Sequence, residues 1–397
     1  MTYLRYIKGK ILEHHRDPKF HNFMGSGVAP QNGLLETLLQ RAGRKGQELG
    51  SVEKLLRSNH PRQWGDEKLI EAVREHYGFE NSEPGPERSQ VKILPVAGGS
   101  PGLWFVFQAL LSRASGDRVL VETPTYGPFF EIPHYLGVKV DWLPRRGLTF
   151  EVDPAQVQRR VTQDTRLVVL SNLHNPGGHL LTTEALVAIA AAAKRSNPKI
   201  RILVDETFRD FAGVPRQPAA TLDRCFISLS SLTKVYGLGA LRCGWLMATG
   251  KTFWAITEAW LQAQNIGSAL TDAMAAVALG DQGLMEGWKE RLIRHRQIAE
   301  EKLTSLGDRL EYNFPPHGCI CFPRVCGMPA EKLVRELEAH DQVGVVPGRY
   351  FRAPKHIRIG FGGFSEDARL EEALDAFCKG VKRADGSLQK GRGRKGL

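Results

Sequence analysis

Short apolar runs alternate with longer amphipathic stretches through the middle of this chain. The apolar runs predict strands at residues 118–122, 138–143, 167–171, 202–205, 226–229 and 244–248. An Ala-rich amphipathic stretch at 183–195 begins at the Thr182/Thr183 pair, which is a favourable helix cap, and predicts a helix between two of these strands. Strands that alternate with helices favour an α/β fold of three layers, in which helices cover both faces of a mostly parallel sheet.

The pattern changes at about residue 298 to a compact mixture of helices and strands. Helical patterns at 299–306 and 329–339 alternate there with strand patterns around 319–324, 343–347 and 356–363. This change predicts a smaller α+β domain, which the N-terminal segment helps to complete. The predicted organisation is an N-terminal arm with part of the small domain (1–45), a large ligand-binding domain (46–275), the rest of the small domain (276–378) and a basic, disordered tail (379–397).

Composition and charge narrow the class of protein. Of the 397 residues, 42% are hydrophobic and 24% are charged, which are ordinary values for globular domains. No apolar run approaches the ~20 residues that span a bilayer, and charges interrupt the N-terminal segment. We therefore expect a cytoplasmic protein without a membrane contact.

The net charge of +11 is concentrated at the C-terminus. Residues 379–397 contain seven Lys or Arg and one Asp. Such a run is attractive to nucleic acid, but this one has no aromatic side chain for base stacking, so nucleic acid is not the expected partner.

The six cysteines do not suggest a disulfide framework in so long a chain. Three of them, Cys319, Cys321 and Cys326, are close together in the sequence. Their spacing is C-x-C-x4-C with no second C-x-x-C pair, which is not the usual pattern of a structural zinc site. We therefore expect thiols and no metal.

The chemistry is concentrated in the segment SLSSLTKVYGLGALRCGW, residues 228–245. Its hydroxyls, such as Ser231, together with Gly-rich backbone and Arg242, are the groups that bind a phosphate dianion. Lys234 lies among them and can form an imine with an aldehyde. A ligand with both groups is pyridoxal phosphate, which is the hypothesis that the segment supports.

Polar residues follow several other predicted strands. Tyr126, Asn175 and Asp205 each lie at or just beyond a strand end, where ligands bind in parallel α/β sheets. Gly99 and Ser100 begin an apolar helix, where free backbone amides make an anion site, although such turns also occur without ligands. The segment MGSGVAPQNG at 24–33 would let a ligand come close to its backbone, or is a simple turn.

These motifs resemble the fold type I pyridoxal-phosphate enzymes of the class I/II aminotransferase family. The resemblance covers residues 24–375 and is carried by NPGG at 175–178, VDETF at 204–208, SLTKVYGLGALR at 231–242 and HIRIGF at 356–361. It implies a large domain of the pyridoxal-phosphate transferase type and an enzyme that moves the amino group of an L-α-amino acid to a 2-oxo acid. It also implies a homodimer, since the site of such enzymes lies at a subunit interface.

The resemblance assigns a role to each matching residue. Lys234 would form the imine (aldimine) with the cofactor, Asp205 would pair with its ring nitrogen, and Asn175 would donate to its 3′-oxygen. Tyr126 would stack on the ring. The phosphate would be held by Gly99, Ser100, Ser231 and Arg242, and the substrate carboxylate by Arg358, with Asn175 and Val28 also near the substrate.

Two positions depart from the family pattern. Phe208 stands where the family has a tyrosine that donates to the 3′-oxygen, so we expect a higher pKa for the imine. His60 stands where a tyrosine normally reaches the phosphate of the neighbouring subunit; histidine can still donate there, with some pH dependence. These departures leave open a lyase, cyclase or oxidase with the same cofactor. A hypothesis of another class is a non-catalytic domain with a nucleic-acid-binding basic tail.

Overall fold

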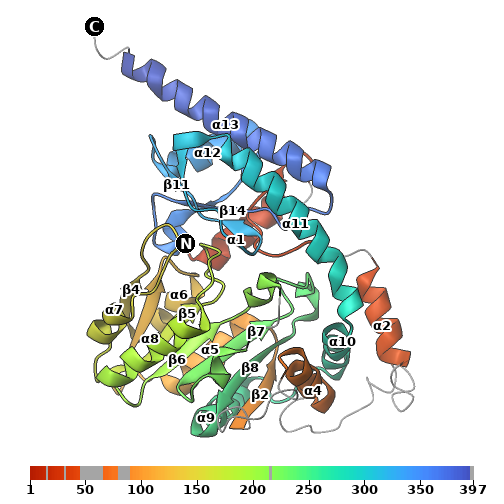
Figure 1. The fold of residues 1–397 in the computed structure, drawn as a ribbon, viewed down its shortest axis with the longest axis vertical. Helices are drawn as coiled ribbons and strands as arrows, with labels where there is room; N and C mark the ends of the chain where they lie inside the picture. Colours follow the sequence, from red (N-terminus) through yellow and green to blue (C-terminus); the bar gives the residue numbers. More distant parts are fainter. Residues whose placement is uncertain (15–16, 31–32, 45–65, 79–89, 214–216, 394–397) are drawn as a thin grey trace.

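A computed structural model describes residues 1–397 except 15–16, 31–32, 45–65, 79–89, 214–216 and 394–397. Its centre is a seven-stranded sheet whose strands occur in the order β2-β8-β7-β6-β5-β3-β4 (Figure 1). Their bounds are β2 Val91–Val96, β3 Arg118–Thr123, β4 Lys139–Pro144, β5 Thr165–Ser171, β6 Arg201–Asp205, β7 Phe226–Ser231 and β8 Gly244–Thr249. β8 is antiparallel to both of its neighbours, and the other paired strands are parallel. The predicted α/β fold with a mostly parallel sheet is confirmed.

Helices cover both faces of this sheet, which explains why its strands are apolar without strict alternation. Along β5, Leu167 and Val169 pack into one core cluster and Val168 and Leu170 into another. The first cluster lies under α5 (Gly99–Leu110), α6 (Pro128–Tyr135) and α9 (Gly250–Ala263), and the second under α7 (Pro154–Arg160) and α8 (Thr183–Ser196). α8 begins as predicted, because the Thr182 hydroxyl accepts a hydrogen bond from the backbone N–H of Ala185.

A second unit of helices and short strands lies above the sheet in Figure 1. Its helices are α1 Tyr3–His14, α11 Gln282–Thr304, α12 Ala330–Asp341 and α13 Asp367–Gly393. Its strands are β1 His21–Asn22, β9 Leu310–Glu311, β10 Ile320–Cys321, β11 Arg324–Val325, β12 Val343–Gly344, β13 Val346–Pro347 and β14 Ile357–Gly360. β1 pairs in parallel with β12, so the N-terminal segment joins this unit as its pattern predicts.

Three further helices flank the second unit and the sheet, namely α2 Leu34–Arg44, α4 Glu67–His76 and α10 Ala269–Gly280. Short 3₁₀ turns lie at 209–212, 219–221, 239–241, 307–309 and 348–351. Within the described ranges, no helix is both long enough and apolar enough to cross a membrane.

The prediction of a disordered tail from residue 379 is wrong, because α13 continues to Gly393. The apolar side of this helix extends past the predicted boundary: Phe377, Val381 and Ala384 are all buried at helical spacing. Arg383 also pairs with Glu336 and Asp341 of α12, which explains why a basic sequence folds here. The C-terminal end of α13 lies away from the sheet (Figure 1).

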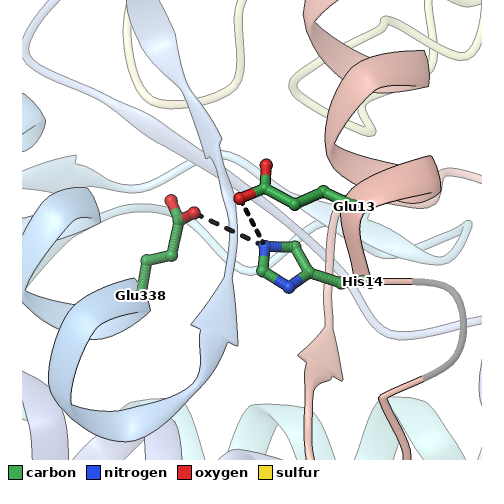
Figure 2. A group of neighbouring side chains, drawn as sticks. All are labelled: Glu13, His14 and Glu338. Atoms are coloured by element: carbon green, nitrogen blue, oxygen red, sulfur yellow. Dashed lines mark ion pairs between the residues drawn. The ribbon is translucent and has the colours of Figure 1, made fainter.

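α1 is fastened to α12 by an ionic cluster (Figure 2). His14 Nε2 lies 3.5 Å from Glu338 Oε1 and 3.8 Å from Glu13 Oε1. Two carboxylates and an imidazole at this spacing are metal-ligand types. Lys10, however, donates to Glu338 and lies 3.0 Å from Glu13, so an ammonium group already supplies the positive charge. The cluster therefore serves to hold α1 in place.

Candidate active site

A cavity of about 600 Å³ lies at the carboxyl ends of the parallel strands. Strand ends deliver its polar groups: Ser231 ends β7, Asp205 ends β6, Asn175 follows β5 and Tyr126 follows β3. Gly99 and Ser100 enter from the start of α5, and the loop after β7 adds Lys234 and Arg242. Phe208 also lines the cavity. The structure thus brings together nine of the predicted residues, as expected for strand ends of one sheet.

The amine of Lys234 is prepared to act as a nucleophile. Burial, followed by the nearby Arg358 guanidinium, lowers the pKa of Lys234 from 10.5 to about 8. A larger fraction of neutral amine is therefore present near neutral pH than on an exposed lysine. Its backbone carbonyl accepts a 3.0 Å hydrogen bond from the N–H of Val28, which fixes the loop that carries it.

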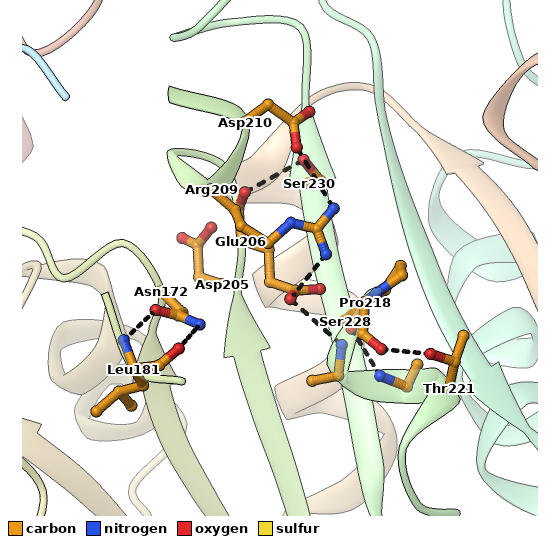
Figure 3. A network of polar contacts seen from close by, with 12 residues as sticks. Asn172, Leu181, Asp205, Glu206, Arg209, Asp210, Pro218, Thr221, Ser228 and Ser230 are labelled. Carbon is orange, nitrogen blue, oxygen red and sulfur yellow. Dashed lines mark hydrogen bonds and ion pairs between the residues drawn. The ribbon is translucent and has the colours of Figure 1, made fainter. Parts of the chain in front are cut away.

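Asp205 is the last residue of β6, and its side chain lines the same cavity as Lys234. Burial raises the pKa of its carboxyl, while Thr207 opposes this rise by hydrogen bonding, including a 3.0 Å bond from its backbone N–H to Oδ1. Figure 3 shows that the carboxylate of Asp205 points away from that of its neighbour Glu206. Glu206 pairs instead with Arg209 at 3.1 Å, so Asp205 is left to meet a cation in the cavity.

An anion cradle forms where Arg242 passes the first turn of α5. The guanidinium donates to the carbonyl of Ala97 at 3.2 Å. Gly98 has a φ of +95°, and a β-carbon there would lie 2.6 Å from Nη2 of Arg242, so only glycine allows this approach. The first amides of a helix have no partner within it and favour negative charge. With Ser231 and Thr233 also in the lining, this corner suits a phosphate.

Arg358 lies behind Asn175, buried completely and outside the cavity lining. It donates through Nη1 to Asn175 Oδ1 at 3.1 Å and through Nη2 to the carbonyl of Met24 at 2.8 Å. Within the described chain its Nε has no hydrogen-bond partner. A buried arginine with an unused donor beside the cavity is suited to a carboxylate ligand.

Two other predictions have different outcomes. The Val28 side chain packs in the hydrophobic core and does not line the cavity; Met24, Gly25 and Ser26 line it instead. The backbone of this segment, rather than the valine side chain, is what approaches the site. His60 falls outside the described residues.

Aromatic packing places Tyr126 and Phe208. The Tyr3 ring of α1 meets Tyr126 edge-on at 5.3 Å, and the pKa of the Tyr126 phenol is raised, mainly by burial. Phe208 is 5% exposed and lies 6.1 Å from the ring of Phe211. Because Phe208 faces the cavity without a hydroxyl, the departure predicted at this position falls inside the site.

Sequence reasoning missed the contribution of α1. Leu4, Ile7, Lys8 and Ile11 all line the cavity and share one face of the helix. Their spacing at i, i+3, i+4 and i+7 signals a helix with a distinct face, but not what that face meets. Thr207, which supports Asp205, was also missed because it lies between two motif positions.

A second, larger hollow of about 1280 Å³ lies at the β4 edge of the sheet. Arg113, Tyr135, Trp142 and Arg352 are among its lining residues, and the predicted site residues that the structure describes are not. The chemistry therefore belongs to the smaller cavity.

Known proteins of one family are similar to this chain. The family profile "Aminotransferase class I and II" matches residues 24–377. The chain belongs to this family. A relative named aspartate/prephenate aminotransferase from Thermus thermophilus is 26% identical over 331 residues, which is 81% of this chain and 82% of the relative. A relative named capreomycidine synthase from Streptomyces vinaceus is 28% identical over 338 residues, with coverage of 81% and 82%.

Solved structures show the same fold. The aspartate aminotransferase of Rhizobium meliloti superposes with a TM-score of 0.79 at 20% identity, over 96% of each chain. An aminotransferase of Mycobacterium tuberculosis gives 0.79 at 22% identity, again over 96% of each chain. The three-layer fold and the family predicted from the sequence are both confirmed.

The protein is a pyridoxal-phosphate-dependent aminotransferase, and its cavity fits that cofactor. An amine with a lowered pKa, a half-buried carboxylate and a helix-start cradle closed by an arginine match an aldehyde, a ring cation and a phosphate. No one of these features alone would select the cofactor. Their presence in one cavity does.

Proposed function

We propose that this aminotransferase uses Lys234 both to bind the cofactor and to move the substrate proton. The bound group supplies an aldehyde for the amine and a protonated ring that accepts electrons from the substrate. Lys234, once released by an incoming amino acid, would take the proton from the substrate Cα and give it to the cofactor carbon that had carried the aldehyde. The lowered pKa of Lys234 supports this role, because a base with a pKa near 8 exchanges protons readily at neutral pH.

The other groups hold the reactants. Asp205 keeps the ring nitrogen protonated, Asn175 donates to the 3-oxygen, and Tyr126 packs on the ring. Arg242, Ser231, Gly99 and Ser100 bind the phosphate. Arg358 binds the α-carboxylate as a bidentate fork, for which its buried position beside Asn175 gives a fixed orientation.

The observation that carries this proposal is the meeting of Lys234, Asp205 and the Arg242 cradle in one cavity. The test is spectroscopic. Purified protein supplied with pyridoxal phosphate should show visible absorbance that Lys234→Ala abolishes and that amino acid substrates convert. A protein that stays colourless with added cofactor would contradict the proposal.

The need for an amino acceptor distinguishes transfer of the amino group from elimination, cyclisation or oxidation. Release of 2-oxo acid should depend strictly on a second 2-oxo acid, and the kinetics should be ping-pong. Sustained product formation without an acceptor would show that the enzyme catalyses one of these other reactions, as the departure at Phe208 leaves open.

The substrate side chain that we propose is apolar or aromatic. The α1 face presents Leu4, Ile7 and Ile11 to the cavity, and Leu103 of α5 lines it too. Burial of apolar substrate surface against these side chains is worth ~25 cal/mol per Å². Lys8 is exposed on the same face of α1, and its ammonium group would instead favour a substrate with an acidic side chain.

A screen of amino acids for conversion of the bound cofactor decides between these substrates. Leucine, methionine or phenylalanine should react with a higher kcat/KM than aspartate or glutamate, and Lys8→Met should leave that order unchanged. Preference for aspartate, lost in Lys8→Met, would reverse the assignment.

We also propose a cytoplasmic homodimer with the domain division 1–45, 46–275 and 276–378. Family membership supports the dimer, and the pairing of β1 with β12 supports a small domain built from N-terminal and C-terminal segments. Sedimentation of the purified enzyme tests the dimer. Limited proteolysis tests the division.

A further inference from the structure

A fully buried ion pair between Arg145 and Glu122 lies behind the cavity, and neither residue is among those proposed to bind the cofactor or the substrate. Arg145 and Glu122 both have side chains that are 0% exposed, and Nη2 of Arg145 lies 2.5 Å from Glu122 Oε2. Nε of Arg145 donates to the same oxygen at 2.7 Å, while Nη1 donates to the carbonyl of Phe150 at 2.9 Å and Nη2 to the carbonyl of Ser171 at 2.8 Å. Buried ion pairs are weak devices for stability, since desolvation offsets most of their attraction. Stability alone therefore does not account for this pair.

Glu122 connects this ion pair to β5, the strand that neighbours β3 in the sheet. Its Oε1 accepts two hydrogen bonds from Ser171, one from the backbone N–H at 2.9 Å and one from the hydroxyl at 2.5 Å. Because the Ser171 proton is committed to Glu122, its hydroxyl oxygen can only accept from other groups. The group that donates to it is the backbone N–H of Asn175, at 3.1 Å.

Asn175 connects this chain to the cavity. Its Oδ1 accepts from Arg358, and a guanidinium has donors only, so the amide orientation is determined. Nδ2 then lies on the opposite side of the amide and is left to donate to a ligand, since Asn175 lines the cavity. The hydrogen bonds thus run without a break from Arg145 through Glu122 and Ser171 to Asn175 and Arg358.

We propose that Glu122, Arg145 and Ser171 are positioning residues for catalysis, which hold Asn175 and, through it, Arg358 against the ligand. The inference rests on the proposed function of Asn175 and Arg358. None of the three positioning residues lines the cavity, and they hydrogen-bond to one another and to backbone groups, so they act through the orientation of Asn175 and Arg358. Since hydrogen-bond geometry in a site must be held within fractions of an ångström, such a support affects rate as well as stability.

The neighbouring strands supply a matched control. Glu206, Arg209 and Ser228 form a second buried Glu–Arg–Ser group, in which the Ser228 hydroxyl accepts from the N–H of Ala220 at 2.9 Å (Figure 3). Ser228 is 0% exposed and Ser171 is 2% exposed. The group at Ser228 leads to a 3₁₀ turn at 219–221 and away from the cavity. Removing either hydroxyl should cost similar stability, but only Ser171 should affect the site.

The experiment compares Ser171→Ala with Ser228→Ala in the holoenzyme. Ser171→Ala should lower kcat/KM about tenfold, chiefly through a higher KM for the amino acid. It should also move the midpoint of the pH titration of bound-cofactor absorbance upward, because a displaced Asn175 stabilises the 3-oxygen anion less. Ser228→Ala should change the melting temperature by a similar amount and leave both of these quantities unchanged.

Equal changes in the two variants, or an unchanged titration in Ser171→Ala, would overturn the positioning role. If Ser171→Ala does not fold, the double variant Glu122→Gln/Arg145→Met removes both buried charges together and tests the same chain; it should reproduce the shift. A wild-type protein that binds no cofactor would refute the proposed function itself. A wild-type enzyme that works, with variants that titrate identically, would refute only the positioning role.

Discussion

The backbone N–H of Val28 donates a 3.0 Å hydrogen bond to the carbonyl of Lys234. The same segment continues to Ala29, whose N–H donates to Gly362 at 3.0 Å, just after β14. The backbone of Lys234, the lysine proposed to be catalytic, is thereby fixed by the N-terminal segment on one side of the cavity. Gly27 lies so close that a β-carbon on it would be 3.1 Å from the carbonyl oxygen of Lys234.

Gly27→Val should therefore displace Lys234. The added methyl groups extend beyond a β-carbon that is already at the limit of contact, so the loop of Lys234 must move. We expect cofactor affinity and kcat/KM to fall about 10- to 100-fold, as followed by visible absorbance and steady-state rates. The control is Gly363→Val, since nothing lies within 4 Å of a β-carbon at Gly363. Equal effects in both variants would argue against a close contact at Gly27.

Capture of the cofactor by the apoenzyme should follow the pKa of Lys234. Because only the neutral amine attacks the aldehyde, the rate of binding should rise with pH to a plateau, with a midpoint near 8. An ordinary lysine would give a midpoint near 10.5. Stopped-flow absorbance between pH 6 and pH 10 measures it, and a rate still rising steeply above about pH 9.5 would contradict the shift.

The same pKa has a consequence for stability with a defined sign. The folded-state pKa of Lys234 lies below its unfolded value, so between pH 8 and 10.5 the unfolded chain binds more protons at this site. Lys234 therefore lowers the unfolding free energy of the apoprotein by its full amount below pH 8. This loss of stability disappears as the pH rises to 10.5. Lys234→Met should be more stable than wild type at pH 7 and should lose that advantage by pH 10.5. Urea unfolding of the two apoproteins at both pH values tests the sign.

Loosening α1 should weaken substrate binding, since one face of α1 lines the cavity. Lys10→Met removes the ammonium that joins Glu13 to Glu338 and leaves two carboxylates facing each other. A partly exposed ion pair is worth at most about 1 kcal/mol, so KM for the amino acid should rise about two- to fivefold with kcat little changed. The control is Lys302→Met, which breaks an ion pair with Asp375 between α11 and α13. An unchanged KM in Lys10→Met would mean that α1 is held by other contacts.

Arg209→Met should be among the most destabilising single changes in the core. It leaves the carboxylate of Glu206 buried at 1% side-chain exposure without its cation. Loss of one partner of a buried pair costs about 3–5 kcal/mol in unfolding free energy, while removal of both partners costs less. Arg209→Met/Glu206→Gln should therefore recover part of the loss in denaturant unfolding. A double variant no more stable than the single one would show that packing, not charge, dominates.

Much of the site could be predicted from the sequence because parallel strands end at one edge of a sheet. Asn175, Asp205 and Lys234 are far apart in the chain, yet each follows a recognisable strand, so their meeting follows from the topology alone. The bounds of β5 and β6 differ from the predicted ones by at most two residues. The sequence also predicts Gly99 and Ser100, because a glycine-rich turn between strand and helix has few alternative conformations.

What the sequence did not reveal depends on tertiary contacts. Ser171 and Glu122 look like ordinary strand-end residues until the sheet order places β5 beside β3. The composition of the tail predicts disorder because charged residues dominate it. Val381 and Ala384 are too few to indicate a helix until α12 supplies the surface that buries them. Composition describes a segment alone, whereas folding depends on the surface that it meets.

The position of α1 also bears on how this enzyme could change over time. The apolar groups proposed to meet the substrate side chain come in large part from the 12 residues of α1, while the residues proposed for proton transfer and cofactor binding belong to the sheet and its loops. Exchange of this short segment, by recombination in nature or by a synthetic gene in the laboratory, would therefore alter substrate preference with little disturbance of the chemistry. New substrates could be acquired through the part of the protein on which catalysis depends least.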